Sequence, residues 1–149
     1  PALVLVDSAL AVPLDALLFG ASRRTYIYTA VANEEKRSAL EALGTTVITM
    51  PNNAGKVDLP AMLQDLGRRE INELHVEAGY KLNGSLLREG LIDELLVYLA
   101  PKLMGEGMGL AQMSPLTSLA EAHALSFHAV DRIGDDLRIL ARLQGRDRF

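Results

Sequence analysis

Residues 74–95 constrain the fold more than any other stretch, because a strand pattern and a helix pattern follow one another there directly. The apolar run at 74–78 predicts a β-strand, and leucines then recur at helical spacing from residue 82 onward. Gly79 separates the two patterns, and Gly90 supplies the left-handed stop that commonly ends a helix. The sequence therefore predicts a strand that runs into a helix and then toward another strand.

Glu77 lies inside this predicted strand, two residues before the turn. A carboxylate at the end of an apolar strand is costly to bury, so it is either paired with an Arg or Lys, the commoner case, or kept for a ligand. His75 is in phase with Glu77, which leaves both an acid–base pair and a structural histidine open. Gly79 lets a phosphate approach the backbone, and the helix that follows offers unpaired N–H groups and the positive end of its dipole. An anionic ligand would bind at this point.

The first half of the chain repeats the same order of elements. Apolar or β-branched runs at 3–6, 25–29 and 45–49 predict strands. Two helices are predicted between and after them; the first is capped by Asn33 and closed by Gly44, and the second is capped by Asp58 and closed by Gly67. Repeated strand–helix units of this length imply a parallel sheet with right-handed crossovers.

The first strand ends in Asp7 and Ser8. Ligands of open α/β sheets bind at the carboxyl ends of the strands, and a Ser hydroxyl there can donate to a phosphate. An Asx or Ser turn that caps the strand explains the same residues equally well.

The pattern changes in the second half of the chain. A strand at 94–101 precedes a loop at 102–115 that carries glycines and methionines, and two more strands follow at 122–131 and 137–143. Gly134-Asp135 between them is a two-residue hairpin signal, so we expect the sheet to gain an antiparallel edge. In the first strand of this hairpin, alternation places Leu125, Phe127 and Ala129 on one face.

Composition excludes several classes of protein. The net charge of −4 and the 5% of aromatic residues argue against nucleic acid as a partner. The chain has no cysteine, and its three histidines lack metal-ligand spacing, so we expect no metal site. No stretch is long and apolar enough for a membrane span and no signal peptide precedes the first strand, which predicts a cytoplasmic protein with no membrane partner. The P-loop-like spelling from Gly79 to Ser85 lacks the lysine that ATP chemistry needs.

Three motifs occur together and in order: V-E-A-G at 76–79, G-L-I-D-E at 90–94 and A-P-K-L-M-G at 100–105. On these motifs the chain closely resembles the reductase domain of the bifunctional riboflavin-biosynthesis deaminase/reductase family, RibD, over nearly its whole length. The resemblance implies a three-layer dihydrofolate-reductase-like α/β fold over residues 1–143, mostly parallel with an antiparallel C-terminal edge hairpin, followed by a flexible tail at 144–149. It also implies NADPH-dependent reduction of 5-amino-6-(5-phosphoribosylamino)uracil to its ribitylamino form, in a homodimer.

The same resemblance assigns roles to individual residues. Glu77 would be the catalytic residue and would contact the substrate near the ribosyl C1′, the carbon that accepts hydride. The residues implied to contact the cofactor are Ser8, Thr29, Ala78, Gly79, Tyr80, Lys81 and Leu82. For Thr29, an ordinary residue at the end of a strand remains the preferred reading.

The chain departs from the family pattern on its N-terminal side. The zinc deaminase domain is absent, and so is the first part of the reductase domain, which in relatives supplies most substrate contacts. We therefore expect an incomplete portion of the enzyme that turns over poorly alone, because positioning is a large share of hydride-transfer catalysis. The alternatives are a non-catalytic nucleotide-binding or dimerisation fragment, and another reductase of the same fold.

Overall fold

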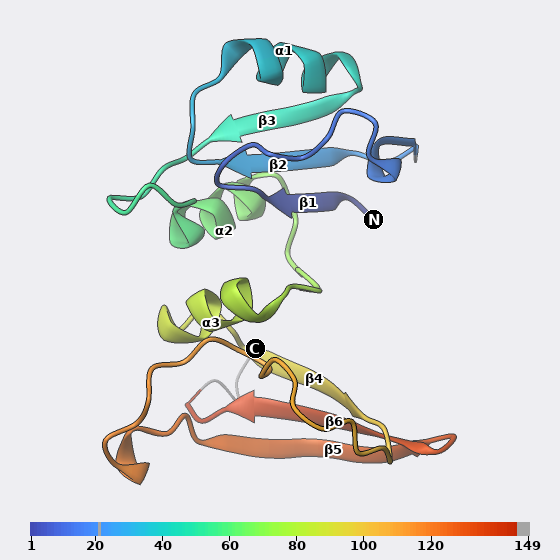
Figure 1. Ribbon diagram of the computed structural model, residues 1–149, viewed down its shortest axis with the longest axis vertical. Coiled ribbons are helices and arrows are strands. Elements are labelled where there is room, and N and C mark those ends of the chain that lie inside the picture. Colours follow the sequence, from blue (N-terminus) through green and yellow to red (C-terminus); the bar gives the residue numbers. More distant parts are fainter. Residues whose placement is uncertain (21, 146–149) are drawn as a thin grey trace. The chain divides into compact units, whose positions relative to one another are not determined.

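The computed structural model describes residues 1–20 and 22–145 (Figure 1). The chain divides into two compact units, Pro1–Leu74 and His75–Phe149, and each is described by itself. The first contains β1 (Leu3–Val6), the short 3₁₀ helix η1 (Leu17–Gly20), β2 (Thr25–Thr29), α1 (Glu34–Ala42), β3 (Thr45–Thr49) and α2 (Leu59–Arg68). The second contains α3 (Tyr80–Arg88), β4 (Glu94–Leu99), the 3₁₀ helix η2 (Leu119–Glu121), β5 (Leu125–Ile133) and β6 (Asp136–Leu143).

The first unit is a parallel sheet between two helices. Its strand order is β1-β2-β3, and both strand pairs are parallel. All five residues of the central strand, β2, are buried. The predicted strands and their parallel pairing are confirmed.

The two faces of β2 pack against different helices. Ile27 lies in one apolar cluster with Leu40 of α1 and Val47 of β3. On the opposite face the Tyr28 hydroxyl donates to Asp65 of α2, and Arg69, which follows α2, stacks over the Tyr26 ring. Successive side chains of a strand point to opposite faces, so this alternation produces three layers: helix, sheet and helix.

The predicted helix caps are present. The Asn33 side chain accepts a hydrogen bond from the Lys36 N–H at 3.0 Å, and Asp58 does the same for Ala61 at 3.0 Å. These bonds satisfy N–H groups that the first turn of a helix leaves unpaired.

Gly44 ends α1 with a φ of 81°, as predicted. The prediction that Gly67 closes α2 is wrong, because the helix continues to Arg68. Glu70 takes the left-handed conformation instead, with a φ of 64°. The Ile71 N–H then bonds the Leu66 carbonyl at 3.0 Å, which completes a Schellman turn around a residue that is not glycine.

The second unit contains an antiparallel sheet in the order β4-β6-β5. Gly134, with a φ of 63°, and Asp135 join β5 to β6, so the predicted hairpin is confirmed. The Gln144 N–H donates to the Ala124 carbonyl and extends the hairpin by one bond. The rest of the predicted tail, residues 146–149, lies outside the described residues.

The prediction that Phe127 and Ala129 share a face of β5 is wrong, because the strand contains a β-bulge between them. Phe127 pairs with Ala141, but Ala129 pairs with Leu140, because the register shifts between them. A bulge inserts one extra residue and exchanges the faces beyond it. Ala129 therefore does not share a face with Phe127; Val130, which pairs with Ile139, takes that place.

The predicted strand at 74–78 is wrong. Residues 71–79 form an irregular segment without a strand partner among the described residues. Its apolar pattern suits a strand, but a strand also needs a neighbour that pairs with its backbone groups. Without that strand, the parallel and antiparallel parts predicted from the sequence form two separate three-stranded sheets.

Candidate functional site

The start of α3 matches the predicted anion site in its local geometry. Gly79 is the residue that caps the helix, and it makes no side-chain cap bond. Among residues 1–20 and 22–145, no acceptor pairs with the N–H groups of Tyr80, Lys81 and Leu82. Since such groups carry the positive end of the helix dipole, a phosphate is a fitting acceptor for them.

The space in front of Gly79 is open. A Cβ added there meets no atom within 4 Å, and the φ of −82° is one that any residue adopts. Neither packing nor backbone conformation therefore requires glycine at this position. Gly84, in the middle of α3, differs, because its Cβ would overlap the backbone of Gln112. Close approach of a ligand backbone or phosphate is a remaining physical reason for a glycine at residue 79.

Glu77 lies two residues before α3 and faces solvent, with 87% of its side chain exposed. Its carboxylate is 3.6 Å from Nε2 of His75, which is itself 65% exposed. The prediction that Glu77 lies in a strand is wrong, and its exposed carboxylate is accessible to a ligand. The neighbouring Ala78 is half-buried, and its carbonyl accepts a hydrogen bond from Asn83.

Ser8 and Thr29 lie together at the carboxyl ends of β1 and β2. The Thr29 hydroxyl donates to the Ser8 carbonyl at 3.4 Å and accepts from the Val31 N–H at 3.3 Å. The Ser8 hydroxyl accepts a bond from the Val57 N–H at 3.1 Å. The Thr29 hydroxyl thus holds the turns that follow β1 and β2, while the Ser8 hydroxyl holds the loop between β3 and α2, and Thr29 is fully buried. Cofactor contact by either residue stays a prediction.

Asp7, which precedes Ser8, shows the turn-capping role left open by the sequence. Its carboxylate accepts the Val12 N–H at 2.8 Å.

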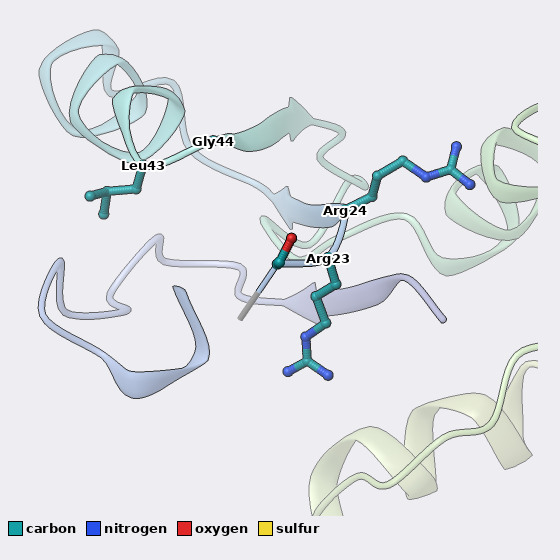
Figure 2. A pocket seen from close by; sticks show the side chains of 5 residues that line it. Arg23, Arg24, Leu43 and Gly44 are labelled. Carbon is teal, nitrogen blue, oxygen red and sulfur yellow. The ribbon is translucent and has the colours of Figure 1, made fainter. Parts of the chain in front are cut away.

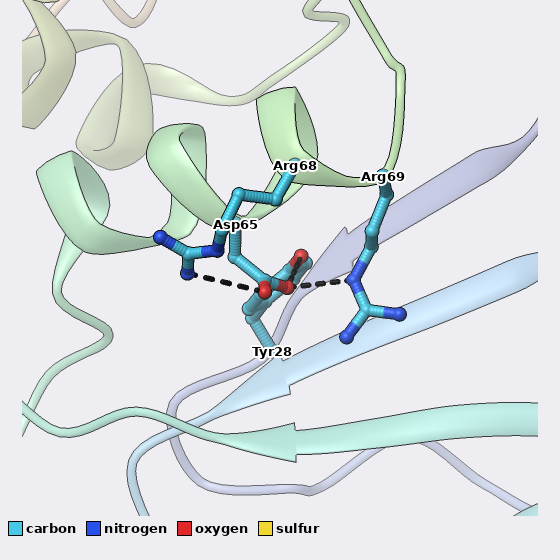
Figure 3. A network of polar contacts seen from close by, with 4 residues as sticks. All are labelled: Tyr28, Asp65, Arg68 and Arg69. Atoms are coloured by element: carbon cyan, nitrogen blue, oxygen red, sulfur yellow. Dashed lines mark hydrogen bonds and ion pairs between the residues drawn. The ribbon is translucent and has the colours of Figure 1, made fainter.

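A polar network joins β2 to α2 in the first unit (Figure 3). Asp65 accepts bonds from the Tyr28 hydroxyl and from Nε of Arg69, each at 2.7 Å, and from Arg68 at 3.3 Å. The hydrogen bond from Arg69 holds the pKa of Asp65 below its usual value. Burial, together with the bond to Asp65, raises the pKa of the Tyr28 phenol well above its usual range. The network keeps a buried phenol neutral and ties the helix to the sheet.

A shallow depression lies near the amino ends of β2 and β3, lined by Ser22, Arg23, Arg24, Leu43 and Gly44 (Figure 2). Figure 2 shows that the two arginine side chains point in different directions. The two side chains therefore do not converge on a common ligand. The depression lies at the amino ends of the parallel strands, whereas Ser8 and Thr29 lie at the carboxyl ends.

The described residues contain neither a metal-binding cluster nor a membrane-spanning helix. They contain no group of three or more His, Asp or Glu side chains placed to hold a metal ion. No helix among residues 1–20 and 22–145 has the length and apolar character that crossing a membrane requires.

Sequence reasoning missed two features. The first is the Tyr28–Asp65–Arg69 network, although a tyrosine in a buried strand needs a partner for its hydroxyl and Asp65 and Arg69 have the i,i+4 spacing of a helical ion pair. The second is the side-chain bonding of Asn83. An asparagine in a helix interior is itself a signal, since this residue disfavours helices unless its amide has a partner.

The comparisons with known proteins agree on one family. A family model described as RibD C-terminal domain matches residues 1–139. The riboflavin biosynthesis protein RibD of Escherichia coli is 39% identical over 109 residues, which is 72% of this chain and 29% of that protein. A 5-amino-6-(5-phosphoribosylamino)uracil reductase of Buchnera aphidicola is 35% identical over 97 residues, 64% of this chain and 47% of that protein. The chain thus spans less than a third of the E. coli relative.

The fold agrees as well. A solved structure of Acinetobacter baumannii RibD superposes with a TM-score of 0.79 at 23% identity, covering 95% of this chain and 37% of that one. The likeness confirms the predicted α/β, dihydrofolate-reductase-like fold. With the family model matched over residues 1–139, the chain belongs to the RibD C-terminal domain family.

Proposed function

We propose that this chain supplies the dinucleotide-binding part of an NADPH-dependent 5-amino-6-(5-phosphoribosylamino)uracil reductase of riboflavin biosynthesis. Family membership supports the reaction class. The observation that carries the cofactor assignment is the start of α3, where a glycine that the fold does not require precedes three unpaired N–H groups. The bridging phosphates of NADPH would accept bonds from Tyr80, Lys81 and Leu82. When bound, NADPH supplies a hydride.

In this proposal Glu77 is the catalytic residue. Its exposed carboxylate lies two residues before α3, on the segment that leads to the phosphate-binding turn. A carboxylate beside the ribosyl C1′ favours the positive charge of a ring-opened iminium, the form of the substrate that accepts hydride. Ala78 and Gly79 link the carboxylate to the phosphate-binding turn. One short stretch of chain would therefore contact both the substrate and the cofactor phosphates. Cofactor contact by Ser8 or Thr29 of the first unit is a separate proposal, and Thr29 is the weaker candidate because its side chain is fully buried.

The sharpest test of cofactor binding exploits the opposite demands of helix and ligand at residue 79. Asp is a better helix cap than Gly, so Gly79→Asp should leave the melting temperature of the free chain unchanged or slightly raised. The same carboxylate repels a phosphate, so NADPH-dependent thermal stabilisation should disappear. In the parent chain this stabilisation should reach about 2.7 kcal/mol at 100 times the dissociation constant.

The matched control is Gly67→Glu, which adds the same charge at another glycine with open space around it. It should keep the NADPH-dependent stabilisation. Equal stabilisation of the parent and Gly79→Asp by NADPH would contradict the assignment of the site.

Turnover separates the proposed activity from its alternatives. With NADPH and authentic substrate, we expect the 149-residue chain to bind the cofactor and to turn over poorly. Steady NADPH oxidation would show that the chain is a complete catalyst. Binding without any turnover favours a non-catalytic nucleotide-binding fragment, and turnover with dihydrofolate alone favours a different reductase of the same fold.

We further propose that the chain forms a homodimer through one face of its antiparallel sheet. Phe127 and Val130 of β5 share this face, and they are 72% and 53% exposed. Phe127 is the most exposed large apolar side chain of the three strands, and exposed apolar surface of this kind marks an association surface. Phe127→Glu should convert dimer to monomer in analytical ultracentrifugation, whereas Tyr98→Glu on the opposite face of the sheet should not. A monomeric parent chain would refute the proposal.

A further inference from the structure

The segment that carries Glu77 is held by very few hydrogen bonds. Among the described residues, the backbone N–H and C=O groups of residues 72–78 take part in one hydrogen bond. In that bond the Ala78 carbonyl accepts from the side chain of Asn83 at 3.2 Å. The position of Glu77, the residue before Ala78, therefore depends on a side chain one turn into α3.

Asn83 uses the same amide nitrogen for a second bond. Its Nδ2 also donates to the Leu110 carbonyl at 3.0 Å, in the loop at 102–115. An asparagine amide has two N–H donors, and here each has one carbonyl as its partner. Asn83 thus joins the Glu77 segment and the glycine-bearing loop to the same helix.

The loop end of this connection is fixed independently of Asn83. The Gln112 N–H donates to the Tyr80 carbonyl at 2.9 Å, and the Arg88 guanidinium donates to the Gln112 carbonyl. Gly84 allows the loop backbone to lie directly against α3, because any Cβ there would overlap Gln112. The loop would consequently stay on the helix without Asn83, whereas the Glu77 segment would lose its one backbone bond to the described part of the second unit.

We propose that Asn83 is a positioning residue for Glu77. By fastening the Ala78 carbonyl to α3, it fixes the carboxylate relative to the unpaired N–H groups that begin the same helix. Its catalytic consequence depends on the function proposed above; its effect on the segment does not. A misplacement of about 1 Å at a reacting group can lower a rate about 100-fold, so one hydrogen bond at this place matters.

The test reads the segment directly, without a ligand. Backbone ¹⁵N order parameters of residues 76–78 should fall from about 0.85 to below about 0.6 in Asn83→Ala, because the bond to Ala78 is lost. Asn83→Asp keeps the size of the side chain but removes both donors, so it should give the same loss of order. The control is Ser85→Ala, which removes a hydroxyl of α3 that bonds Lys81 and Arg88 but not the segment. It should leave the order parameters of residues 76–78 unchanged.

Unchanged order at residues 76–78 in both folded Asn83 variants would overturn the proposal. NADPH stabilisation, measured beside it, tests the proposed function separately: Asn83→Ala should retain it within about twofold in affinity, since the N–H groups at 80–82 remain. If the parent chain binds no NADPH, the proposed function fails while the order parameters still decide the role of Asn83. Loss of NADPH binding in Asn83→Ala with an ordered segment would assign Asn83 to cofactor binding instead.

Discussion

The two units of the chain differ in how completely they bury their own apolar side chains. In the first, Ile27, Tyr28 and Leu40 are fully buried and helices cover both faces of the sheet. In the second, Leu86 and Ala141 are buried, while Phe127 and Val130 on the sheet face remain largely exposed. Apolar burial is the main favourable term in folding, so the first unit supplies most of the stability that these described residues generate.

The two units also differ in whether their polar groups have partners within the protein. The polar groups of the first unit, such as Asp65 and Thr29, bond one another and the backbone. The backbone N–H groups of Tyr80, Lys81 and Leu82, which begin α3, have no protein acceptor among residues 1–20 and 22–145. In the second unit, a ligand would pair the free N–H groups, and a second copy of the chain would cover the exposed apolar side chains. The polar groups named in the first unit already have partners.

We expect the largest effect from a substitution in the apolar core of the first unit. Leu40→Ala removes a side chain that is 0% exposed and should lower the free energy of unfolding by about 2–5 kcal/mol. The same substitution at Leu103, which is fully exposed at 104%, should change it by less than about 0.5 kcal/mol. Urea titration measures both. Similar losses at the two leucines would contradict the role of Leu40 in the core of the first unit.

The next effect concerns the network around Asp65. Asp65→Asn removes the carboxylate that Tyr28 and Arg69 share and should cost about 1–3 kcal/mol at neutral pH. The folded pKa of Asp65 is lowered, so its contribution is complete above the unfolded pKa of about 3.9 and is lost as pH falls through the folded value. The gap between parent and variant in urea titrations should therefore narrow below about pH 4. A gap that widens with acid would show that the carboxylate is not stabilised by its partners.

Tyr28 should act at the other end of the pH scale. Its folded pKa is raised, so its contribution is full below the unfolded pKa of about 10 and declines as pH rises toward the folded value. Unfolding of the parent should become easier above about pH 10, and Tyr28→Phe should remove that part of the dependence. Circular dichroism melts at graded alkaline pH measure it. Identical alkaline profiles for the two proteins would contradict a buried, neutral phenol.

We expect the smallest effects from substitutions at the residues that end α2 and α3. α2 and α3 close with similar turns, but Glu70 occupies the left-handed position in the first unit and Gly90 occupies it in the second. Glu70→Gly should stabilise by about 0.5–1 kcal/mol, and Gly90→Ala should destabilise by about 1 kcal/mol. Thermal melts should show opposite shifts. Shifts of the same sign would mean that side-chain contacts, and not backbone conformation, dominate at these positions.

The sequence predicted what depends on local signals. The caps at Asn33 and Asp58, the turn at Gly134 and the parallel strands follow from residue type and periodicity. The strand at 74–78 was wrong because a strand depends on a partner elsewhere in the chain. The bulge after Phe127 was equally hidden, since one extra residue changes the face of a strand without changing its composition.

In the candidate site, local sequence signals and distant contacts again differ in what they could predict. The motif at 76–79 marked Glu77 and Gly79, and the structure shows an accessible carboxylate and an open turn there. The bonds of Asn83 depend on the Leu110 carbonyl, 27 residues away, which no local pattern announces.

The most direct test of the central claim is an NADPH titration of the ¹⁵N-labelled chain followed by two-dimensional NMR. If NADPH binds at the start of α3, the largest amide shifts should appear at residues 79–82, and adenosine, which has no phosphate, should not reproduce them. Shifts centred on the depression beside Arg23 and Arg24, or no shifts at all at residues 79–82, would contradict it.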